Sequence, residues 1–267
     1  MNSNIKNNNT ALKQDLLMVK RGIKIEKLYG GYFGSIENCK TILPHIPKSM
    51  FSIKNIAIVD AGSSEGTLGI FVRNEFIKHG GNPYLVLVDT NATSLENSTA
   101  DDEKIVADFR KRTPLERNSI NIVLLRSVLQ YVDPEDQESI LKEIYRILTP
   151  GGILISQHGS FANRIEAGAF NGIFKSFGRK VYFHEKSQWL GLHKKVFGDI
   201  SIISQAPTLY ESMQDFTDRI NASHSEVLAA EGYISRNRIF LENVLTKKEA
   251  TSAWKIPFIT VSCHKTT

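Results

Sequence analysis

The sequence has few cysteines and no long apolar run. Its two cysteines, Cys39 and Cys263, lie far apart and in no metal-ligand spacing, so the sequence indicates neither a disulfide framework nor a thiolate metal site. No stretch approaches the run of about 18 apolar residues that a membrane-spanning helix needs. The Asn-rich start "MNSNIKNNNT" also lacks the apolar segment of a signal peptide. We therefore expect a cytoplasmic protein with no bound metal and no membrane partner.

Acidic residues are scarce mainly at the start of the chain. The formal net charge is +5, and residues 1–55 hold nine Lys and Arg against three Asp and Glu, which leaves the remainder nearly neutral. This basic segment is compatible with contact to phosphate and equally with the solvated faces of helices. We expect a small-molecule partner, with nucleic acid as the less favoured alternative and a homodimer left open.

The apolar pattern changes at residue 55 to short runs that alternate with amphipathic stretches. Such runs, apolar on both faces, are typical of parallel strands that helices cover from two sides. The expected strands are 55–60, 84–90, 120–125 and 152–157, with later strands at 197–205 and 254–265. The expected helices of this part are 67–79 and 134–148. The sequence therefore predicts an α/β fold.

Helical patterns also occur on both sides of this region. One helix is expected over residues 11–28 and a second, capped by Ser35, over 35–46. Two apolar stripes are interpreted mainly as core, with contact to an acceptor as the alternative: Phe170, Phe174 and Phe177, and Leu209, Met213, Phe216 and Ile220. We predict an N-terminal helical segment or lid over 1–54 and a domain over 55–267 with a helical cap insertion at about 207–250.

The stretch "VDAGSSEGT" (residues 59–67) is open to two interpretations. Ser64 fits the GxSxG elbow of serine hydrolases, but that elbow comes late in its sheet and needs an upstream oxyanion loop, for which no HGGG-like sequence occurs. The alternative is a nucleotide-binding turn, in which glycines let the main chain approach a ligand at a helix N-terminus. Gly62 and Gly66 favour this second interpretation.

Four pieces of sequence, in the right order, resemble the Rossmann-like class I S-adenosylmethionine (SAM)-dependent methyltransferases. They are "VDAGSSEG" after the first strand, "VLVDT" at the end of the second, "VADF" in the following loop, and "RILTPGG" leading into the fifth strand. The resemblance implies a mostly parallel seven-stranded sheet with helices on both faces, N-terminal helices, and a helical insertion between the last two strands. It also implies SAM as the cofactor.

The resemblance carries over to named positions where the motifs match. The implied cofactor-binding residues are Asp60, Gly62, Ser64, Gly66, Asp89, Asp108, Phe109 and Arg126. Asp60 would face the amino group of the methionine part, and Asp89 would accept hydrogen bonds from both ribose hydroxyls. Asp108 would bind the adenine amino group beside Phe109, and the carbonyl region at Arg126 would lie near the methyl group.

Methyl transfer from a sulfonium depends on alignment and exclusion of water, so a general base is optional. His158, expected just after the fifth strand, and Tyr131, just after the fourth, are the candidate bases, with an ordinary polar loop residue as the alternative for each. The run "LRSVLQYV" lacks the Asn/Asp-Pro-Pro-aromatic turn of base-modifying enzymes, which disfavours DNA adenine methylation.

We therefore predict SAM-dependent methyl transfer to a small molecule, such as a specialised metabolite. The alternatives are an RNA or protein methyltransferase, and a SAM-binding protein that transfers no methyl group, such as a cyclase or a regulator.

Overall fold

The computed structural model describes residues 32–99, 102–248 and 251–266. The helix expected over 11–28 therefore lies outside the described residues. The helices are α2 (Ile36–Lys40), α3 (Thr67–Lys78), α4 (Ala92–Glu96), α5 (Pro134–Ile147), α6 (Arg164–Ser176), α7 (Lys186–Phe197), α8 (Met213–Ile220) and α9 (His224–Arg236). The strands are β1 (Ala57–Ala61), β2 (Tyr84–Asp89), β3 (Glu103–Val106), β4 (Ile120–Arg126), β5 (Leu148–Phe161), β6 (His184–Glu185), β7 (Ile202–Ser212), β8 (Leu245–Lys248) and β9 (Thr251–His264). None of the helices in the three ranges is long and apolar enough to cross a membrane.

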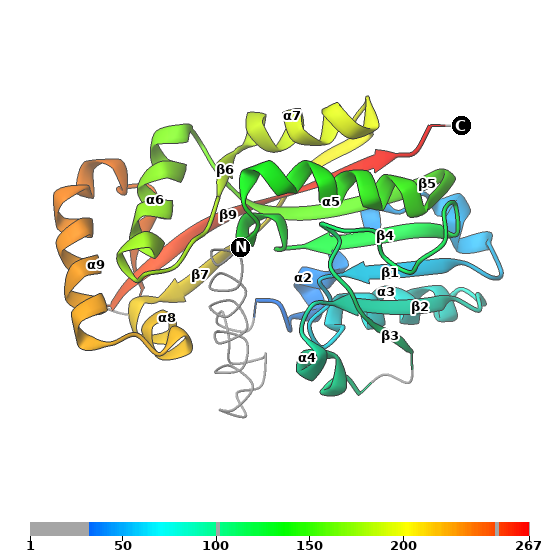
Figure 1. The fold of residues 1–267 in the computed structure, drawn as a ribbon, viewed down its shortest axis with the longest axis horizontal. Helices are drawn as coiled ribbons and strands as arrows, with labels where there is room; N and C mark the ends of the chain where they lie inside the picture. The colour runs from blue at the N-terminus through cyan, green and yellow to red at the C-terminus, as the bar shows by residue number, and fades with distance from the viewer. Residues whose placement is uncertain (1–31, 100–101, 249–250, 267) are drawn as a thin grey trace, which may run out of the picture.

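The strands form one sheet whose main path has the order β3-β2-β1-β4-β5-β9-β7 (Figure 1). The short strands β6 and β8 pair with β5 and β9 beside this path. Strands β1 to β5 pair in parallel, whereas β9 runs antiparallel to both β5 and β7. The mostly parallel sheet that the sequence predicts is confirmed.

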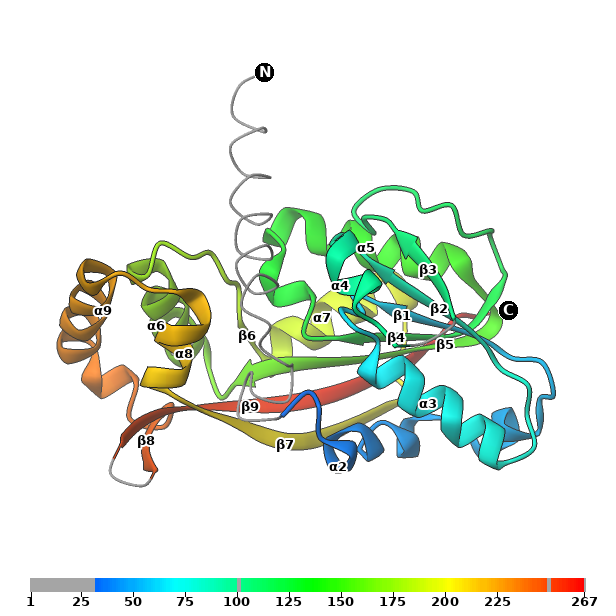
Figure 2. The same cartoon turned by 90° about the horizontal axis from the view of Figure 1, so that it is seen from below.

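Helices cover both faces of this sheet (Figure 2). On one face α5 and α7 pack against inward side chains such as Val59 and Val123. On the other face α2 and α3 pack against the alternate side chains, such as Ile58 and Ile122. Neighbouring residues on one strand point to opposite faces, so burial on both sides accounts for the continuous apolar runs.

The helix α5 follows directly from its sequence. Pro134 occupies the first turn, acidic residues follow it there, and Arg146 lies in the last turn, an arrangement that complements the helix dipole. Its buried face, which includes Ile140 and Ile144, joins the core under the sheet. The helix predicted over 134–148 is confirmed, and β5 begins immediately after it at Leu148.

A second cluster, which we call the cap, lies beyond the carboxyl ends of β1 and β4 (Figure 1). It consists of α6, α8 and α9, packed on the far ends of β5, β7 and β9. The predicted stripe of Phe170, Phe174 and Phe177 is buried in it, which supports the core interpretation. The helices α8 and α9 lie between β7 and β9.

Two strands extend further than the sequence indicates. Strand β7 continues to Ser212, so Leu209 lies on a strand opposite Ile256, and the predicted helical stripe is wrong at this position. Strand β5 continues to Phe161, so His158 lies inside it rather than after it. In both cases pairing with β9 supplies backbone hydrogen bonds that a local pattern does not reveal.

The described N-terminal residues belong to the core rather than to a separate body. Ser35 caps α2, because its hydroxyl accepts a hydrogen bond from Asn38 N at 3.3 Å, as predicted. Helix α2 is followed by two 3₁₀ turns, η2 (Leu43–His45) and η3 (Lys48–Ser52). Cys39 and Ile42 from this segment are buried in the same cluster as α3.

The cap yields a test of packing. Phe216 is fully buried, and its ring centroid lies 4.9 Å from that of Phe174, 5.1 Å from Phe177 and 5.8 Å from Trp254. The change Phe216→Ala should lower the free energy of unfolding by about 3 to 5 kcal/mol, because it leaves a cavity among these rings. Phe240, which is 44% exposed, provides the control, since Phe240→Ala should change the free energy of unfolding by less than about 0.5 kcal/mol. Urea unfolding measures both, and equal effects would contradict this packing.

Candidate functional site

The turn between β1 and α3 brings bare main chain to the carboxyl edge of the sheet. Gly62, Ser64 and Gly66 adopt left-handed conformations, with φ of 70°, 51° and 86°. A Cβ atom added to Gly66 would lie 2.6 Å from Leu87 Cδ1, and one added to Gly62 would overlap Val128. The turn is therefore packed closely against the end of β2 and the residues after β4, and only glycine fits at its two outer positions.

Asp89 holds this turn in place. Its Oδ2 accepts a hydrogen bond from Ser64 N at 2.8 Å, and its Oδ1 accepts one from Asn91 N at 2.9 Å. Each carboxylate oxygen keeps a second lone pair. The predicted role of Asp89 toward the ribose hydroxyls is therefore compatible with the orientation that the backbone imposes on it.

Asp60 is a buried carboxylate at the end of β1, with 3% of its surface exposed. Its Oδ2 accepts a hydrogen bond from Gly69 N in α3 at 2.8 Å. Burial raises the pKa of Asp60 to about 6, although the Gly69 hydrogen bond and the charge of Arg126 oppose this shift. A carboxylate that is costly to ionise here gains from a neighbouring cation, as the predicted contact with an amino group would provide.

The loop after β3 differs from the expectation in one contact. The carboxylate of Asp108 is bound by its near neighbour Arg110, whose Nη2 lies 2.7 Å from Oδ2 and whose backbone N lies 2.9 Å from Oδ1. This pairing lowers the pKa of Asp108 against the effect of burial. Phe109 is buried in the core cluster of α5. A contact of Asp108 with adenine would therefore share the carboxylate with Arg110, which the sequence analysis missed.

Arg126 brings a positive charge to the same edge. The backbone at Arg126 ends β4, as predicted, and its side chain turns toward the N-terminal residues. Its Nη2 donates to Phe33 O at 3.0 Å, its Nη1 lies 3.6 Å from Cys39 Sγ, and its guanidinium carbon lies 5.2 Å from the centroid of the Phe33 ring. The sequence indicated the backbone position, and this side-chain arrangement depends on residues some 90 positions away.

Ser127, which follows Arg126, is a further residue that sequence reasoning missed. It has a φ of 57°, which is unusual for a residue with a side chain. Its hydroxyl is buried and has no hydrogen-bond partner among residues 32–99, 102–248 and 251–266. Strained, unpaired polar groups of this kind gather at functional sites, and the only signal in the sequence is a small polar residue at the end of a buried strand.

His158 does not occupy the position that a general base requires. It is fully buried within β5, and its ring is stacked on Trp189 with centroids 4.5 Å apart. Burial, together with the nearby His193 and His184, lowers the pKa of His158 well below its ordinary value. The expected loop position is corrected, because pairing with β9 draws this residue into the sheet, and the neutral ring has the surroundings of a core residue.

Tyr131 lies where the sequence predicts, just after β4. It belongs to the 3₁₀ turn η4 (Leu129–Tyr131), and its side chain is 50% exposed. The structure thus brings together the turn after β1, Asp89, Arg126 and the segment of Tyr131 at one edge of the sheet. His158 follows Gln157, the β5 partner of Arg126, but its ring is buried against Trp189 of α7. The catalytic role of Tyr131 stays a prediction.

Comparison with known proteins gives the family. The family model described as "Methyltransferase domain" matches residues 60–156, which include β1 from Asp60 onward, β2 to β4 and the first part of β5. Residues 60–156 of the chain thus match a methyltransferase domain. The predicted family and the Rossmann-like fold are therefore confirmed.

Relatives of the methyltransferase domain cover different shares of the chain. The carboxy-S-adenosyl-L-methionine synthase of Photorhabdus laumondii subsp. laumondii is 29% identical over 125 residues, which are 43% of this chain and 47% of that protein. The chain thus spans about half the length of the curated relatives it matches. A solved protein of Bacillus halodurans C-125 has a TM-score of 0.70 at 15% identity and covers 86% of this chain and 99% of its own.

A second solved structure contains the cofactor. Phosphoethanolamine N-methyltransferase 2 of Haemonchus contortus, in complex with S-adenosyl-L-methionine, has a TM-score of 0.54 at 15% identity and covers 86% of this chain and 52% of its own. The structure of that neighbour thus holds the cofactor that the sequence resemblance implies for this chain. The residues present here fit that cofactor: a glycine turn with no room for side chains, the oriented carboxylate of Asp89 and the buried carboxylate of Asp60.

Asp60 generates a prediction about stability and pH. Because its pKa in the folded protein is raised above the ordinary value, the folded protein loses stability as the pH rises from about 4 through 6. Asp60→Asn should remove this loss and increase the free energy of unfolding by about 1 to 3 kcal/mol at pH 7.5, with little difference at pH 4.5. It should also weaken SAM binding.

The exposed Asp199 serves as the control for this change. Urea unfolding of Asp60→Asn and Asp199→Asn across the pH range compares the two, and Asp199→Asn should follow the parent protein throughout. A variant Asp60→Asn that is less stable than the parent at pH 7.5 would show that the ionised carboxylate stabilises the fold.

Proposed function

We propose that the chain transfers the methyl group of SAM to a small-molecule acceptor at the carboxyl edge of β1 and β4. The observation that carries this proposal is the turn of Gly62, Ser64 and Gly66 held by Asp89 beside the end of β2. SAM supplies an electrophilic methyl group on a positively charged sulfur. The proposal includes the predicted cytoplasmic location, and a homodimer remains an open alternative.

The residues of this edge have separate tasks in the proposal. Asp60 and the turn hold the amino-acid part of the cofactor, while Asp89 holds the ribose. Tyr131, half exposed at the end of β4, contacts the acceptor. The cap lies beyond the same edge (Figure 1) and, with the segment of Tyr32 and Phe33, excludes water from it. Alignment and exclusion of water supply much of the rate in a displacement of this kind.

The N-terminal segment is joined to the site by contacts that support this cover. Tyr32 is buried, and its hydroxyl donates to Pro207 O on β7 at 2.8 Å. Phe33 receives the hydrogen bond of Arg126 through its carbonyl oxygen. These contacts connect β7, β4 and the N-terminal segment across the edge of the sheet, which is where we propose that the acceptor binds.

A second candidate function follows from the curated relative. It is named a carboxy-S-adenosyl-L-methionine synthase and matches over less than half of its length. The corresponding proposal is that this chain chemically alters or holds SAM without passing its methyl group to a separate molecule. The charged side chain of Arg126 near the end of β4 favours an anionic group at the site in either case.

The role of Asp89 can be tested by binding. Asp89→Asn places an amide NH₂ where a carboxylate oxygen now accepts a backbone hydrogen bond, and it removes an acceptor from the proposed ribose contact. We expect the Kd for SAM, measured by calorimetry, to rise between about tenfold and 100-fold. Asp199→Asn again serves as the control. An unchanged Kd in a folded Asp89→Asn protein would place the ribose elsewhere.

The reaction itself can be tested with methyl-labelled SAM and a pool of candidate metabolites. Methyl transfer moves the label to a low-mass compound in step with formation of S-adenosylhomocysteine. Tyr131→Phe should lower kcat by about 100-fold and leave SAM affinity unchanged, if its hydroxyl acts on the acceptor. SAM consumed with the label retained on its own modified product would support the second candidate instead, and label in RNA or protein would overturn the small-molecule acceptor.

A further inference from the structure

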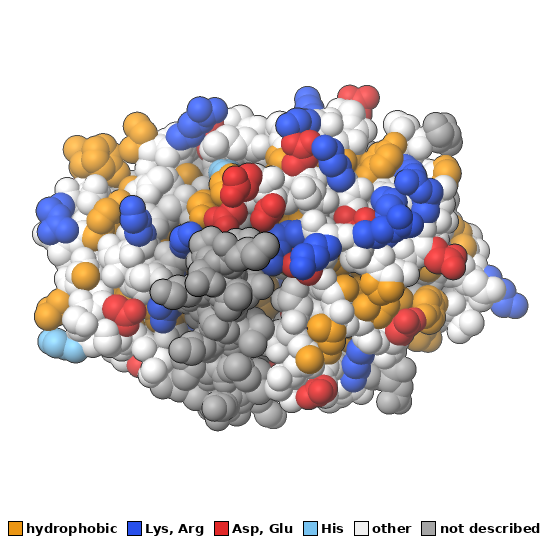
Figure 3. All heavy atoms as spheres, viewed as in Figure 1, with side chains coloured by type: hydrophobic (Ala, Val, Ile, Leu, Met, Phe, Trp, Pro, Cys, Tyr) orange, Lys and Arg blue, Asp and Glu red, His pale blue; other side chains and the backbone are white. Residues whose placement is uncertain are grey.

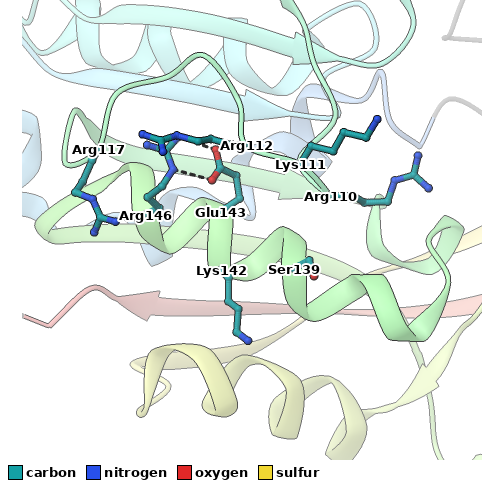
Figure 4. Close-up of a pocket in the computed structure, with 8 residues that line it drawn as sticks. All are labelled: Arg110, Lys111, Arg112, Arg117, Ser139, Lys142, Glu143 and Arg146. Carbon is teal, nitrogen blue, oxygen red and sulfur yellow. Dashed lines mark hydrogen bonds and ion pairs between the residues drawn. The ribbon is translucent and has the colours of Figure 1, made fainter.

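A basic groove lies between the loop of residues 110–117 and α5. Its cavity volume is about 410 Å³, and Figure 4 shows the loop along one side of it and α5 along the other. Six of the eight residues that line the groove are basic and one is acidic: the basic ones are Arg110, Lys111, Arg112, Arg117, Lys142 and Arg146. The lining thus carries a formal charge of +5, as large as that of the whole chain.

Much of this positive charge has no counter-charge in the described part of the chain. Arg110 pairs with Asp108, and Lys142 pairs with Glu138. The exposed side chains of Lys111, Arg112 and Arg117, in contrast, form no ion pair within the described ranges. Lys and Arg side chains also gather over α5 and its neighbouring loop in the surface view (Figure 3).

The single acidic residue fixes the shape of the groove. Glu143 Oε1 accepts hydrogen bonds from Thr113 N and Thr113 Oγ1, both at 2.7 Å, and the carboxylate also pairs with Arg146 at 2.7 Å. Arg146 Nη2 in turn donates to Leu115 O at 2.7 Å. The backbone of the loop is therefore fastened to α5 before any ligand arrives, which lowers the entropic cost of ordering it on binding.

Two neighbouring cations, Arg146 and Lys265, indicate a positive electrostatic potential beside the groove. Arg146 Nη1 is buried and has no hydrogen-bond partner among the described residues. Behind it, Lys265 donates to Tyr145 O and Leu148 O at 2.8 Å each. Burial lowers the pKa of Lys265, and the charges of Arg117 and Arg146 lower it further. An anion in the groove would be stabilised by this surplus.

The types of side chain indicate the class of ligand. Four of the six cations are arginines, whose planar groups match phosphate oxygens in a two-pronged contact. No aromatic or aliphatic side chain lines the groove, so it offers neither a stacking surface for unpaired bases nor an apolar anchor for a membrane. We infer that this groove binds the phosphate backbone of a double-helical nucleic acid, without reading its sequence.

The groove is distinct from the proposed methyl-transfer site and adjoins it at one end. Arg110 follows Phe109 and holds the carboxylate of Asp108, which the family resemblance would place at the adenine end of the cofactor site. A bound duplex would therefore lie along α5 and reach the adenine end of the site. The inference does not depend on the acceptor of the methyl group, so each can fail without the other.

The test uses the full chain and fluorescence anisotropy. The probes are a labelled RNA duplex, a DNA duplex of the same sequence and one of the single strands, each titrated between about 50 and about 200 mM salt. The parent protein should bind both duplexes more tightly than the single strand. The double variant Arg112→Ala and Arg117→Ala should raise the Kd for a duplex at least about tenfold and lower the salt slope by about 2.

The matched control removes two exposed lysines near the end of α6, Lys175→Ala and Lys180→Ala, and has the same net charge as the groove variant. It should bind the duplexes within about twofold of the parent protein. Calorimetry with SAM should give the same Kd for the groove variant and the parent, which separates this inference from the methyl-transfer proposal.

Several results would overturn the inference. One is the absence of duplex binding by the parent protein, and another is an equal loss of binding in both double variants, which would show an effect of overall charge. Competition by polyglutamate as strong as that by the duplex would assign the groove to acidic proteins. Groove-dependent binding to phosphatidylserine vesicles, without binding to a duplex, would assign it to a membrane surface.

Discussion

The hydrogen bond from Ser64 N to the carboxylate of Asp89 connects the ends of two neighbouring parallel strands. Together with backbone hydrogen bonds from Gly62 N to Val88 O and from Gly66 N to Ser63 O, it holds three alternate residues in left-handed conformations, one of them a serine. The bond makes one residue serve two purposes, since Asp89 both stabilises the turn and presents its remaining lone pairs to a ligand. The cofactor site is therefore a property of the sheet as much as of the loop.

Two opposite charges, those of Asp60 and Arg126, lie at the same edge of the sheet. Asp60 is buried at the end of β1, where ionisation is costly, and the side chain of Arg126 lies against the N-terminal segment. Their mutual attraction lowers the cost of both burials. The methyltransferase domain thus has the carboxylate of Asp60 and the guanidinium of Arg126 near the predicted position of the amino-acid part of SAM. These two charges favour a zwitterion over a neutral molecule.

Much of the fold could be predicted from the sequence, because its central strands are apolar on both faces and its helix α5 has a clear polar and apolar side. The strand β3 was not recognised, since its four residues, Glu103 to Val106, are short of apolar side chains and rest on pairing with β2. The far end of β5 depends on distant partners, since His158 pairs with Ile259 of β9 and Phe161 pairs with Glu185 of β6. Local periodicity carries no information about such partners.

The residues of the candidate site likewise fall into those that the sequence could predict and those that only the folded structure reveals. Asp60, the glycines of the turn and Asp89 lie at strand ends, where a motif in the sequence fixes the backbone. The direction of the Arg126 side chain, the burial of His158 and the pairing of Asp108 with Arg110 follow from side-chain contacts. The basic groove also required the fold, because its residues come from two segments that a count of charges along the chain does not bring together.

The position of β9 has a consequence for how the molecule folds. Strands β1 to β4 can pair through short crossovers, whereas β9 inserts between β5 and β7 only after a long loop has closed. The half of the sheet that carries the cap should therefore consolidate late and open first in native-state hydrogen exchange. The ligand edge would then lie at the boundary between an early-folding nucleotide-binding half and a later, more labile half, where local opening could admit and release small molecules.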